Sequence, residues 1–315
     1  MSVLKNMPVS FPGLFGDWEM TASPVCFSIG EKHVYWYGVI IASGLLLALL
    51  FCLRQTKHYG VEEDDLYDLV IWGIPVGILG ARAYYVIFYL SRFQNADGTL
   101  NFQKAIAIWD GGLAIYGAII ACMLMAFVLC RVKKLPMGAV TDVAVMGLLI
   151  GQMIGRWGNF MNREAFGAET TLPWRMRLWV SVSEYIEVHP TFLYESLWNL
   201  LGLLLIVFVV SKARRFDGEN TWFYFLWYGL GRTWVEGLRT DSLYLFDWQL
   251  FGQPIRVSQA LSITMVLVSA LMLLYHLKLR PSDPEQMLVR RKACLAEEID
   301  HETAETAVNE KERGM

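Results

Sequence analysis

The chain has 315 residues, of which 55% are apolar and 18% are charged, with 12 tryptophans and a formal net charge of −3. This balance is too apolar and too aromatic for an ordinary soluble enzyme and is typical of a polytopic membrane protein. No basic run with interleaved aromatic residues indicates a nucleic-acid partner. Five scattered cysteines, without a CxxC pair, predict neither a metal site nor a disulfide framework; they are Cys26, Cys52, Cys122, Cys130 and Cys294.

Residues 1–33 lack the basic start and apolar core of a cleaved signal peptide, and we interpret them as an irregular external N-terminal segment. Seven apolar stretches of about 20 residues follow, each long enough to cross a bilayer. The fold class predicted is therefore an all-α polytopic membrane protein with about seven transmembrane helices and a small external head region. The stretches are 34–53, 66–89, 113–130, 137–154, 190–210, 222–238 and 257–277.

Two stretches are unusual. The second contains Pro75 and several glycines, which predicts a kink or close packing against neighbours. The sixth carries Arg232 and Glu236, so it is the least regular in hydropathy.

Lysines and arginines predict the orientation. They cluster after the first, third, fifth and seventh stretches, which lie on one side if there are seven spans. The positive-inside rule makes that side cytoplasmic, with the N-terminus outside and the C-terminus inside. The predicted domains are the external segment 1–33, a transmembrane bundle 34–280 with an external head at about 160–188, and a polar cytoplasmic tail 281–315.

With this topology, most of the unusual polar residues fall on the outer side. Arg156 directly follows the fourth apolar stretch, and a cation at a membrane boundary costs several kcal/mol unless it has a partner. Asn159, Asn162 and Glu164 come next, and nearby glycines allow a large group such as a lipid headgroup to approach the backbone.

The sixth stretch adds Tyr228, Arg232, Glu236 and Arg239, which steps of four, four and three residues place on one helical stripe. A structural Arg232–Glu236 ion pair is an open alternative. Outer aromatic residues such as Tyr37 are also typical of an interfacial belt, and His189 before a proline is typical of a helix start. Two arginines near one membrane surface can grip one phosphate through bidentate donors, which favours an anionic lipid headgroup as ligand.

The segment 155–167, Gly-Arg-Trp-Gly-Asn-Phe-Met-Asn-Arg-Glu-Ala-Phe-Gly, closely resembles the signature of the prolipoprotein diacylglyceryl transferase family. The resemblance extends, in family order and over about residues 34–240, to five further motifs. These are 35–38, 80–85, 108–112, 189–195 and 228–236.

The resemblance implies a bacterial plasma-membrane enzyme that moves the diacylglyceryl group of phosphatidylglycerol onto the lipobox cysteine of a prolipoprotein signal peptide. A thioether forms and glycerol 1-phosphate leaves, in the first step of lipoprotein maturation. No metal or organic cofactor is expected, and the bundle 34–280 would be the catalytic part.

The roles that we assign follow from this reaction. Arg156 and Arg232 would stabilise the leaving phosphate, and Glu236 would position Arg232 or take the thiol proton. The expected substrate-binding residues are Arg156, Asn159, Glu164, Gly167, Tyr37, Tyr116, Tyr228 and His189, with Gly167 leaving room for the headgroup.

One position departs from the family pattern. Some members carry a histidine in the third-span motif that has been considered as a base, whereas Tyr116 and its neighbours stand here. Tyrosine, with an ordinary pKa of about 10, is a poor base at neutral pH. The proton acceptor stays open among Glu236, Tyr116 and His189, with Glu236 first.

A transporter or channel for an anionic solute is the alternative function. It would need ionisable residues through the whole depth of the membrane, whereas the cytoplasmic half of the spans is apolar apart from Asp142. An intramembrane serine protease is disfavoured because no Gly-x-Ser-x-Gly motif appears.

Overall fold

The computed structural model describes residues 7–16, 18–95, 97–240, 244–250 and 253–299, so 300–315 of the predicted tail lie outside the described residues. The chain divides into two compact units, which are described separately. The first comprises Met1–Arg54 and Asp142–Met287, and the second comprises Gln55–Thr141 and Leu288–Met315.

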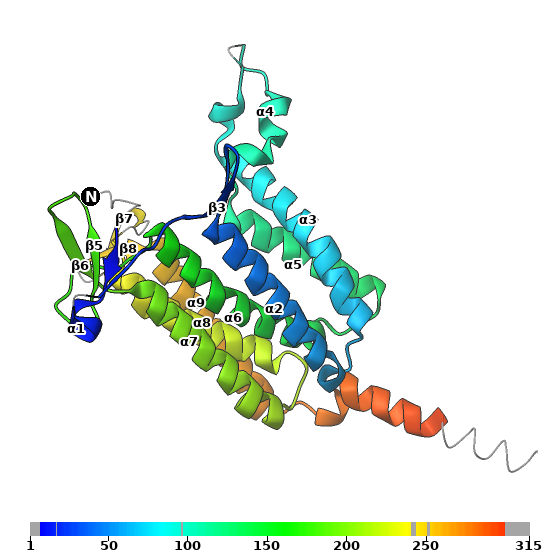
Figure 1. Cartoon of the computed structure of the whole chain (residues 1–315). Helices are drawn as coiled ribbons and strands as arrows, with labels where there is room; N and C mark the ends of the chain where they lie inside the picture. The colour runs from blue at the N-terminus through cyan, green and yellow to red at the C-terminus, as the bar shows by residue number, and fades with distance from the viewer. Residues whose placement is uncertain (1–6, 17, 96, 241–243, 251–252, 300–315) are drawn as a thin grey trace, which may run out of the picture. The chain divides into compact units, whose positions relative to one another are not determined.

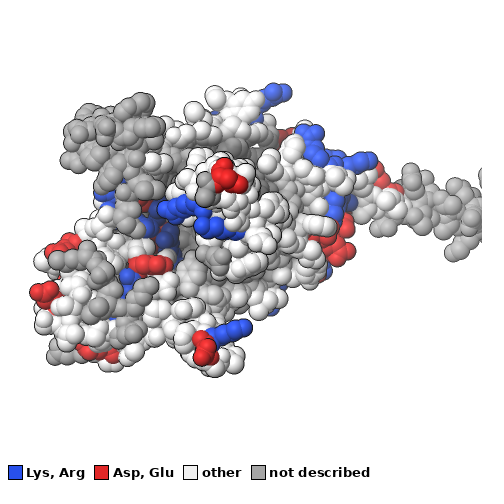
Figure 2. All heavy atoms as spheres, turned by 90° about the horizontal axis from the view of Figure 1, so that it is seen from above, with Lys and Arg blue, Asp and Glu red and all other residues white. Residues whose placement is uncertain are grey.

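Six helical segments in the described part of the chain are long and apolar enough to cross a membrane, and each coincides with a predicted stretch. Their outward faces expose leucine, isoleucine and phenylalanine side chains, and most of the atoms on the face in Figure 2 belong to uncharged residues. Four of the segments are single helices: α2 (Trp36–Tyr59), α3 (Glu63–Phe88), α5 (Ile115–Val132) and α6 (Met137–Asn162). The fifth segment, Thr191–Ala213, consists of α7 (Thr191–Leu205) and the turns η3 (Ile206–Val210) and η4 (Ser211–Ala213). The sixth, Val257–Leu279, consists of α9 (Val257–Leu274) and the turn η5 (Tyr275–Leu279).

The predicted sixth stretch is also a helix, α8 (Glu219–Leu238). It is absent from these six because Glu219, Arg232 and Glu236 lower its hydropathy. All three side chains lie in the protein interior or at its edge, where ion partners stabilise them. The predicted class, a polytopic helical membrane protein with a small head, is confirmed.

In the first unit, close packing joins the helices α2, α6, α7, α8 and α9, which run side by side in Figure 1. A methyl group at Gly147 of α6 would lie 2.9 Å from Cys52 Sγ of α2, and one at Gly229 of α8 would lie 2.8 Å from Val266 of α9. Small residues at these crossings let the backbones approach, as membrane helices require.

A four-stranded antiparallel sheet forms the head of this unit, in the order β2 (Glu19–Met20), β1 (Val9–Ser10), β5 (Met176–Trp179) and β6 (Tyr185–Val188). Val9, Leu178 and Val188 are almost fully buried under it, together with Phe160 at the end of α6 and Phe192 at the start of α7. The sheet is therefore anchored by its core to the helix ends that carry the polar motifs.

The interpretation of 1–33 as irregular is wrong. Besides β1 and β2, this region contains the short helix α1 (Pro12–Phe15) and the hairpin β3 (Val25–Ile29) and β4 (Lys32–Tyr35) that leads into α2. Strand β1 pairs with β5 through Val9–Leu178 and Ser10–Arg177, which are 169 and 167 positions apart in the sequence, so no local pattern predicts the pairing. A second hairpin, β7 (Tyr244–Leu250) and β8 (Gln253–Arg256), precedes α9.

In the second unit, α3 packs closely on α5, as the glycines around Pro75 predict. A methyl group at Gly80 would lie 2.3 Å from the Ala121 side chain, and one at Gly117 would overlap the Gly80 carbonyl. The arm between these helices contains η1 (Leu90–Phe93), α4 (Phe102–Ile106) and η2 (Ile108–Asp110). Residues 288–299 form a further helix in this unit, after the turn η6 (Pro284–Gln286).

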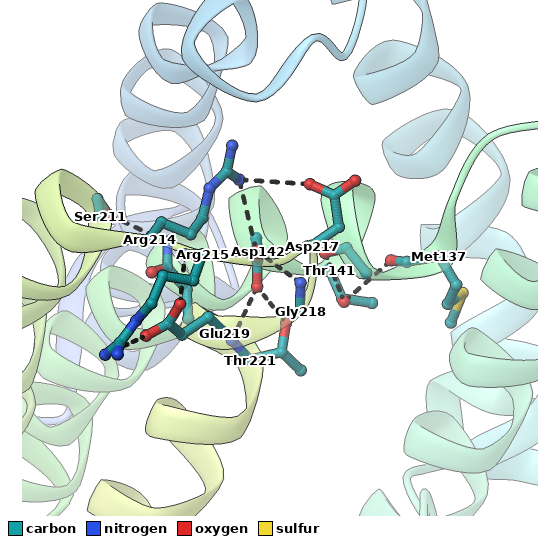
Figure 3. Close-up of polar contacts among 12 residues, drawn as sticks. Met137, Thr141, Asp142, Ser211, Arg214, Arg215, Asp217, Gly218, Glu219 and Thr221 are labelled. Atoms are coloured by element: carbon teal, nitrogen blue, oxygen red, sulfur yellow. Dashed lines mark hydrogen bonds and ion pairs between the residues drawn. The ribbon is translucent and has the colours of Figure 1, made fainter. Parts of the chain in front are cut away.

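Asp142, near the beginning of α6, is completely buried and holds the turn between α7 and α8 (Figure 3). Its carboxylate accepts the backbone N–H of Gly218 at 2.8 Å, and the N–H and hydroxyl of Thr221, each at 2.9 Å. The guanidinium of Arg214 lies 3.5 Å away. Asp142, which is predicted from the sequence to lie in the cytoplasmic half of the spans, thus serves as a helix-start anchor.

Candidate active site

The polar signature 155–162 lies on α6 itself, not after it. Helix α6 continues to Asn162, eight residues beyond the predicted end at Ile154. Gly155 and Gly158 do not end the helix because α2 packs against them: a methyl group at Gly158 would lie 2.7 Å from the Tyr37 ring. The last two turns of α6 therefore present Arg156 and Asn159 from a rigid element one turn apart.

Helix α7 places a carboxylate next to Arg156. Thr191, Glu195 and Asn199 recur at four-residue intervals and are all buried, so they form the inner face of α7. Ser196 fixes this face on α6: its hydroxyl donates to the Met153 carbonyl at 2.9 Å and accepts from Trp157 Nε1 at 3.2 Å. Because Met153 and Trp157 precede and follow Arg156 in α6, these bonds fix the turn of α6 that carries Arg156 against α7.

The opposite side of α7 is fixed on α8 by a tryptophan pair. The rings of Trp198 and Trp227 stack with centroids 4.2 Å apart, and each indole N–H donates to the backbone carbonyl of the other residue at 2.9 Å. Gly202 and Gly231 make room for these rings. Arg232 follows Gly231 directly, so this contact sets its position relative to Glu195.

The two predicted arginines meet on one carboxylate. Glu195 Oε2 forms an ion pair with Arg156 Nη2, and Glu195 Oε1 lies 3.4 Å from Arg232 Nη1. Glu236 pairs with Arg232 at 2.6 Å, one helical turn along α8. When all four groups are ionised, their charges sum to zero.

Glu195 is the residue that sequence reasoning missed. It lies within the motif 189–195, but we assigned it no role from the sequence. The signal was available in the four-residue spacing of Thr191, Glu195 and Asn199, which buries a carboxylate that requires a cationic partner. Its place between two arginines could not be inferred without the packing of α6, α7 and α8.

A hydrogen-bonded chain extends from this cluster towards the head. Arg156 Nη1 is 3.5 Å from Asn159 Oδ1, and the amides of Asn159 and Asn162 both donate to Glu164 Oε1, at 3.1 and 3.2 Å. Arg163 turns the chain out of the helix with φ +53°, and its buried guanidinium donates to the Ala22 carbonyl at 2.9 Å. The three predicted polar residues thus lie together with Arg156.

Gly167 and His189 lie at the junction of head and bundle. The space beside Gly167 is filled by the protein itself, because a Cβ there would lie 2.7 Å from His189 Cβ and 3.1 Å from Thr191 Cγ2. A headgroup therefore cannot lie on the side where a Gly167 Cβ would point, and the contribution of Gly167 to substrate binding stays a prediction. The His189 ring lies 3.1 Å from the Tyr194 hydroxyl, and partial burial lowers the pKa of His189 below its ordinary value.

The predicted tyrosines lie in different surroundings. Tyr228 stacks on Tyr224 and lines a small cavity of about 10 Å³ with Glu195 and Arg232. Tyr37 lines an open groove of about 690 Å³ at the start of α2, which Asn162 borders. Tyr116 is in the second unit, at the first turn of α5 and half exposed, so its contribution to a lipid site stays a prediction.

Comparison with known proteins gives concordant results. Residues 24–275 match the family model described as prolipoprotein diacylglyceryl transferase. The chain is 42% identical over 272 residues to a protein of Lactobacillus delbrueckii subsp. bulgaricus, with 83% of this chain and 94% of the relative covered. It is 42% identical over 275 residues to one of Listeria monocytogenes serovar 1/2a (84% and 94% covered), and 44% identical over 260 residues to one of Limosilactobacillus reuteri (80% and 90% covered).

All three relatives are named phosphatidylglycerol–prolipoprotein diacylglyceryl transferase. The matched region contains every motif on which the resemblance was based and every predicted site residue. No match supports the transporter or channel alternative.

Proposed function

Since the chain belongs to the prolipoprotein diacylglyceryl transferase family, we propose that it transfers the diacylglyceryl group of phosphatidylglycerol to the cysteine thiol of a prolipoprotein lipobox. The observation that carries the assignment to a site is the convergence of Arg156 from α6 and Arg232 from α8 on one point. Two guanidiniums fixed by separate helices suit a single phosphate group.

The reaction is a displacement at the carbon of the diacylglycerol unit that is bonded to the phosphate oxygen. The cysteine sulfur forms a bond to this carbon while the carbon–oxygen bond to phosphate breaks, and glycerol 1-phosphate departs with the electron pair. The thiol loses its proton, and the phosphate changes from a diester to a monoester, so negative charge grows on the leaving group. Catalysis therefore needs a proton acceptor and fixed cationic donors at the phosphate.

Arg156 and Arg232 supply these donors in the proposed mechanism. Their partial exposure, 22% and 18% of the side chain, leaves N–H groups open to a ligand beyond those that the carboxylates occupy. In a site that lipid tails shield from water, such charge-assisted hydrogen bonds strengthen as the leaving oxygen becomes more negative. Asn159 and Glu164 orient Arg156, and Tyr37 and Tyr228 line the lipid path.

Glu236 is our first candidate for the proton acceptor. It is 2% exposed and lies one turn from the phosphate-gripping Arg232, within the same helix. Arg256 donates to its backbone carbonyl, which fixes the end of α8. His189, whose pKa is lowered by partial burial, is the second candidate, and Tyr116 is the third.

We place the protein in the bacterial inner membrane with its N-terminus and head outside and its C-terminus in the cytoplasm. Six apolar helices and the distribution of lysine and arginine support this topology. A reporter fused after Arg280 should behave as cytoplasmic, whereas an external signal would overturn it.

The decisive experiment uses the purified chain, phosphatidylglycerol labelled in its glycerol headgroup, and a signal peptide that contains a lipobox cysteine. We expect release of glycerol 1-phosphate in proportion to thioether formed. A matched peptide with serine in place of the cysteine should release none. Release that is equal with both peptides would indicate a lipid hydrolase and would refute the proposal.

A further inference from the structure

We propose that Glu195 is a positioning residue that acts as an internal counter-anion, occupying the phosphate position between Arg156 and Arg232 until the lipid phosphate replaces it. This inference rests on the proposed function, because it concerns the same two arginines. It assigns to Glu195 a role in substrate affinity and product release.

The geometry of the contact is that of an anion gripped from two sides. One carboxylate oxygen of Glu195 pairs with Arg156, and the other lies 3.4 Å from Arg232. A phosphate accepts from guanidinium groups in the same manner, through two oxygens on one central atom. The donors that Glu195 occupies are therefore those that a phosphate would use.

Glu195 and a phosphate cannot both occupy this position. The Glu195 carboxylate itself fills the position between the two arginines. The cavity beside it, which Glu195, Tyr228 and Arg232 line, measures only about 10 Å³, which is space for about one water molecule. A phosphodiester would also bring a negative charge to a cluster whose four charges already cancel. Exchange removes both obstacles, because the carboxylate can rotate away while α7 stays fixed by Ser196 and Trp198.

Glu236 does not suit this role. It pairs with Arg232 within one helix, and its side chain is 3% exposed against 8% for Glu195. Glu195 bridges arginines of two different helices, α6 and α8, from a third. It therefore holds two mutually repelling guanidiniums at a common point in the absence of lipid, and it competes with the product once transfer has occurred.

Glu195→Gln tests the proposal. The amide keeps the size of the side chain and removes the competing charge, so anions should bind more tightly. We expect the KM for phosphatidylglycerol to fall, the inhibition constant of glycerol 1-phosphate to fall at least about tenfold, and kcat to fall because the product leaves slowly. A merely structural role would leave the inhibition constant unchanged or raise it, and either result would overturn the proposal.

Glu219→Gln is the matched control. Like Glu195, Glu219 is a buried carboxylate with an arginine partner. It lies at the first residue of α8, at the opposite end of that helix from Arg232, so its loss should not alter the inhibition constant for glycerol 1-phosphate. If Glu195→Gln does not fold, Glu195→Asp replaces it: a side chain one methylene shorter bridges less well and should lower the constant to a smaller extent. An unchanged constant in Glu195→Asp would equally overturn the proposal.

The transferase function and the role of Glu195 can be refuted independently of each other. If the unaltered chain transfers no diacylglyceryl group, the proposed function is wrong. If the unaltered chain is active but the inhibition constant in Glu195→Gln is not lowered, the role of Glu195 is wrong and the function stands. Calorimetric titration with glycerol 1-phosphate measures the same change in affinity without turnover.

Discussion

Helix α6 carries a charge near each end, fully buried at Asp142 and partly exposed at Arg156, and the two ends differ in how that charge is satisfied. Asp142 accepts two backbone N–H groups and a hydroxyl at 2.8–2.9 Å, with Arg214 further away at 3.5 Å (Figure 3). Within the described residues, the polar partners of Arg156 are the side chains of Glu195 and Asn159. Backbone donors cannot move without unwinding a helix, whereas side-chain partners can rotate.

The difference separates a structural anchor from an exchangeable site. At Asp142 the partners are parts of the α7–α8 turn, and the carboxylate is fully buried, so no ligand can replace them without local unfolding. At Arg156 the side chain is 22% exposed and its partner is one carboxylate of another helix. A buried ion pair is weak evidence for stability, and the partial exposure of the Arg156 pair suits the proposed exchange of Glu195 for a substrate phosphate.

Asp142→Ala should have the largest effect, and it should act on stability. The substitution leaves the amides of Gly218 and Thr221 without their acceptor, so we expect a loss of roughly 3–5 kcal/mol in the free energy of unfolding. Thermal unfolding in detergent measures this loss. The folded fraction should keep its turnover number. A changed turnover number with unchanged stability would show that Asp142 acts in the reaction and is not a structural anchor.

Arg156→Ala should do the reverse. Loss of one charge-stabilising donor costs roughly 100- to 1,000-fold in kcat in comparable sites, or roughly 2.7–4 kcal/mol of transition-state stabilisation. The helix itself should be little affected, because Ser196 and Trp157 still hold α7 on α6. Transfer assays at saturating lipid, with the melting temperature as control, decide the matter. A variant with normal transfer would remove Arg156 from the mechanism.

Arg82 provides a third case, an arginine held by neutral acceptors. It is 6% exposed, and its guanidinium donates to the carbonyls of Lys104, Ala105, Gly111 and Gly112 while stacking over Phe93. No carboxylate contacts it within the part of the chain that the structure describes. It therefore resembles Asp142 in depending on backbone partners, although it is a cation.

For Arg82→Lys we expect a loss of roughly 2 kcal/mol, because an ammonium cannot reach all four carbonyls. The arm 89–114 should become sensitive to limited proteolysis. Arg92→Lys is the control, since Arg92 is exposed and donates to a single hydroxyl, that of Tyr85. Equal cleavage in both variants would show that the positive charge at position 82 is enough to keep the arm folded, and that the four hydrogen bonds to backbone carbonyls are not required.

The helices were predictable from the sequence because membrane spans are local features. Apolar length fixes where a helix crosses, so all seven stretches proved helical even where boundaries shifted, as for α6 beyond Ile154. The head sheet was not predictable, because Val9 and Leu178 pair across most of the chain. The arginines were found by their cost in an apolar setting, but their meeting on Glu195 depends on tertiary packing.

The smallest effect should come from the head, where another carboxylate lies between two arginines. Glu187 of β6 accepts from Arg175 at 2.5 Å and from Arg177 at 2.8 Å. Partial burial alone would raise the pKa of Glu187, but the hydrogen bonds and charges of these arginines outweigh it, so the pKa lies below its ordinary value. This cluster has the same composition as the Arg156–Glu195–Arg232 contact, but it lies on a solvated sheet.

A carboxylate with a lowered folded-state pKa stabilises the fold above its unfolded pKa of about 4.3, and this contribution is lost as the pH falls through the lower folded value. The protection factors for hydrogen exchange of residues 176–188, which are corrected for the pH dependence of intrinsic exchange, should therefore be higher at pH 6 than at pH 3. Glu187→Gln should reduce that difference by at most about 1 kcal/mol, as for other solvated ion pairs. Glu184→Gln, on the exposed end of the same hairpin, is the control. A strong effect of Glu187→Gln on phosphatidylglycerol affinity would show that the arginine–glutamate cluster of the head also binds lipid. The Arg156–Glu195–Arg232 contact would then no longer be distinguished as the phosphate site.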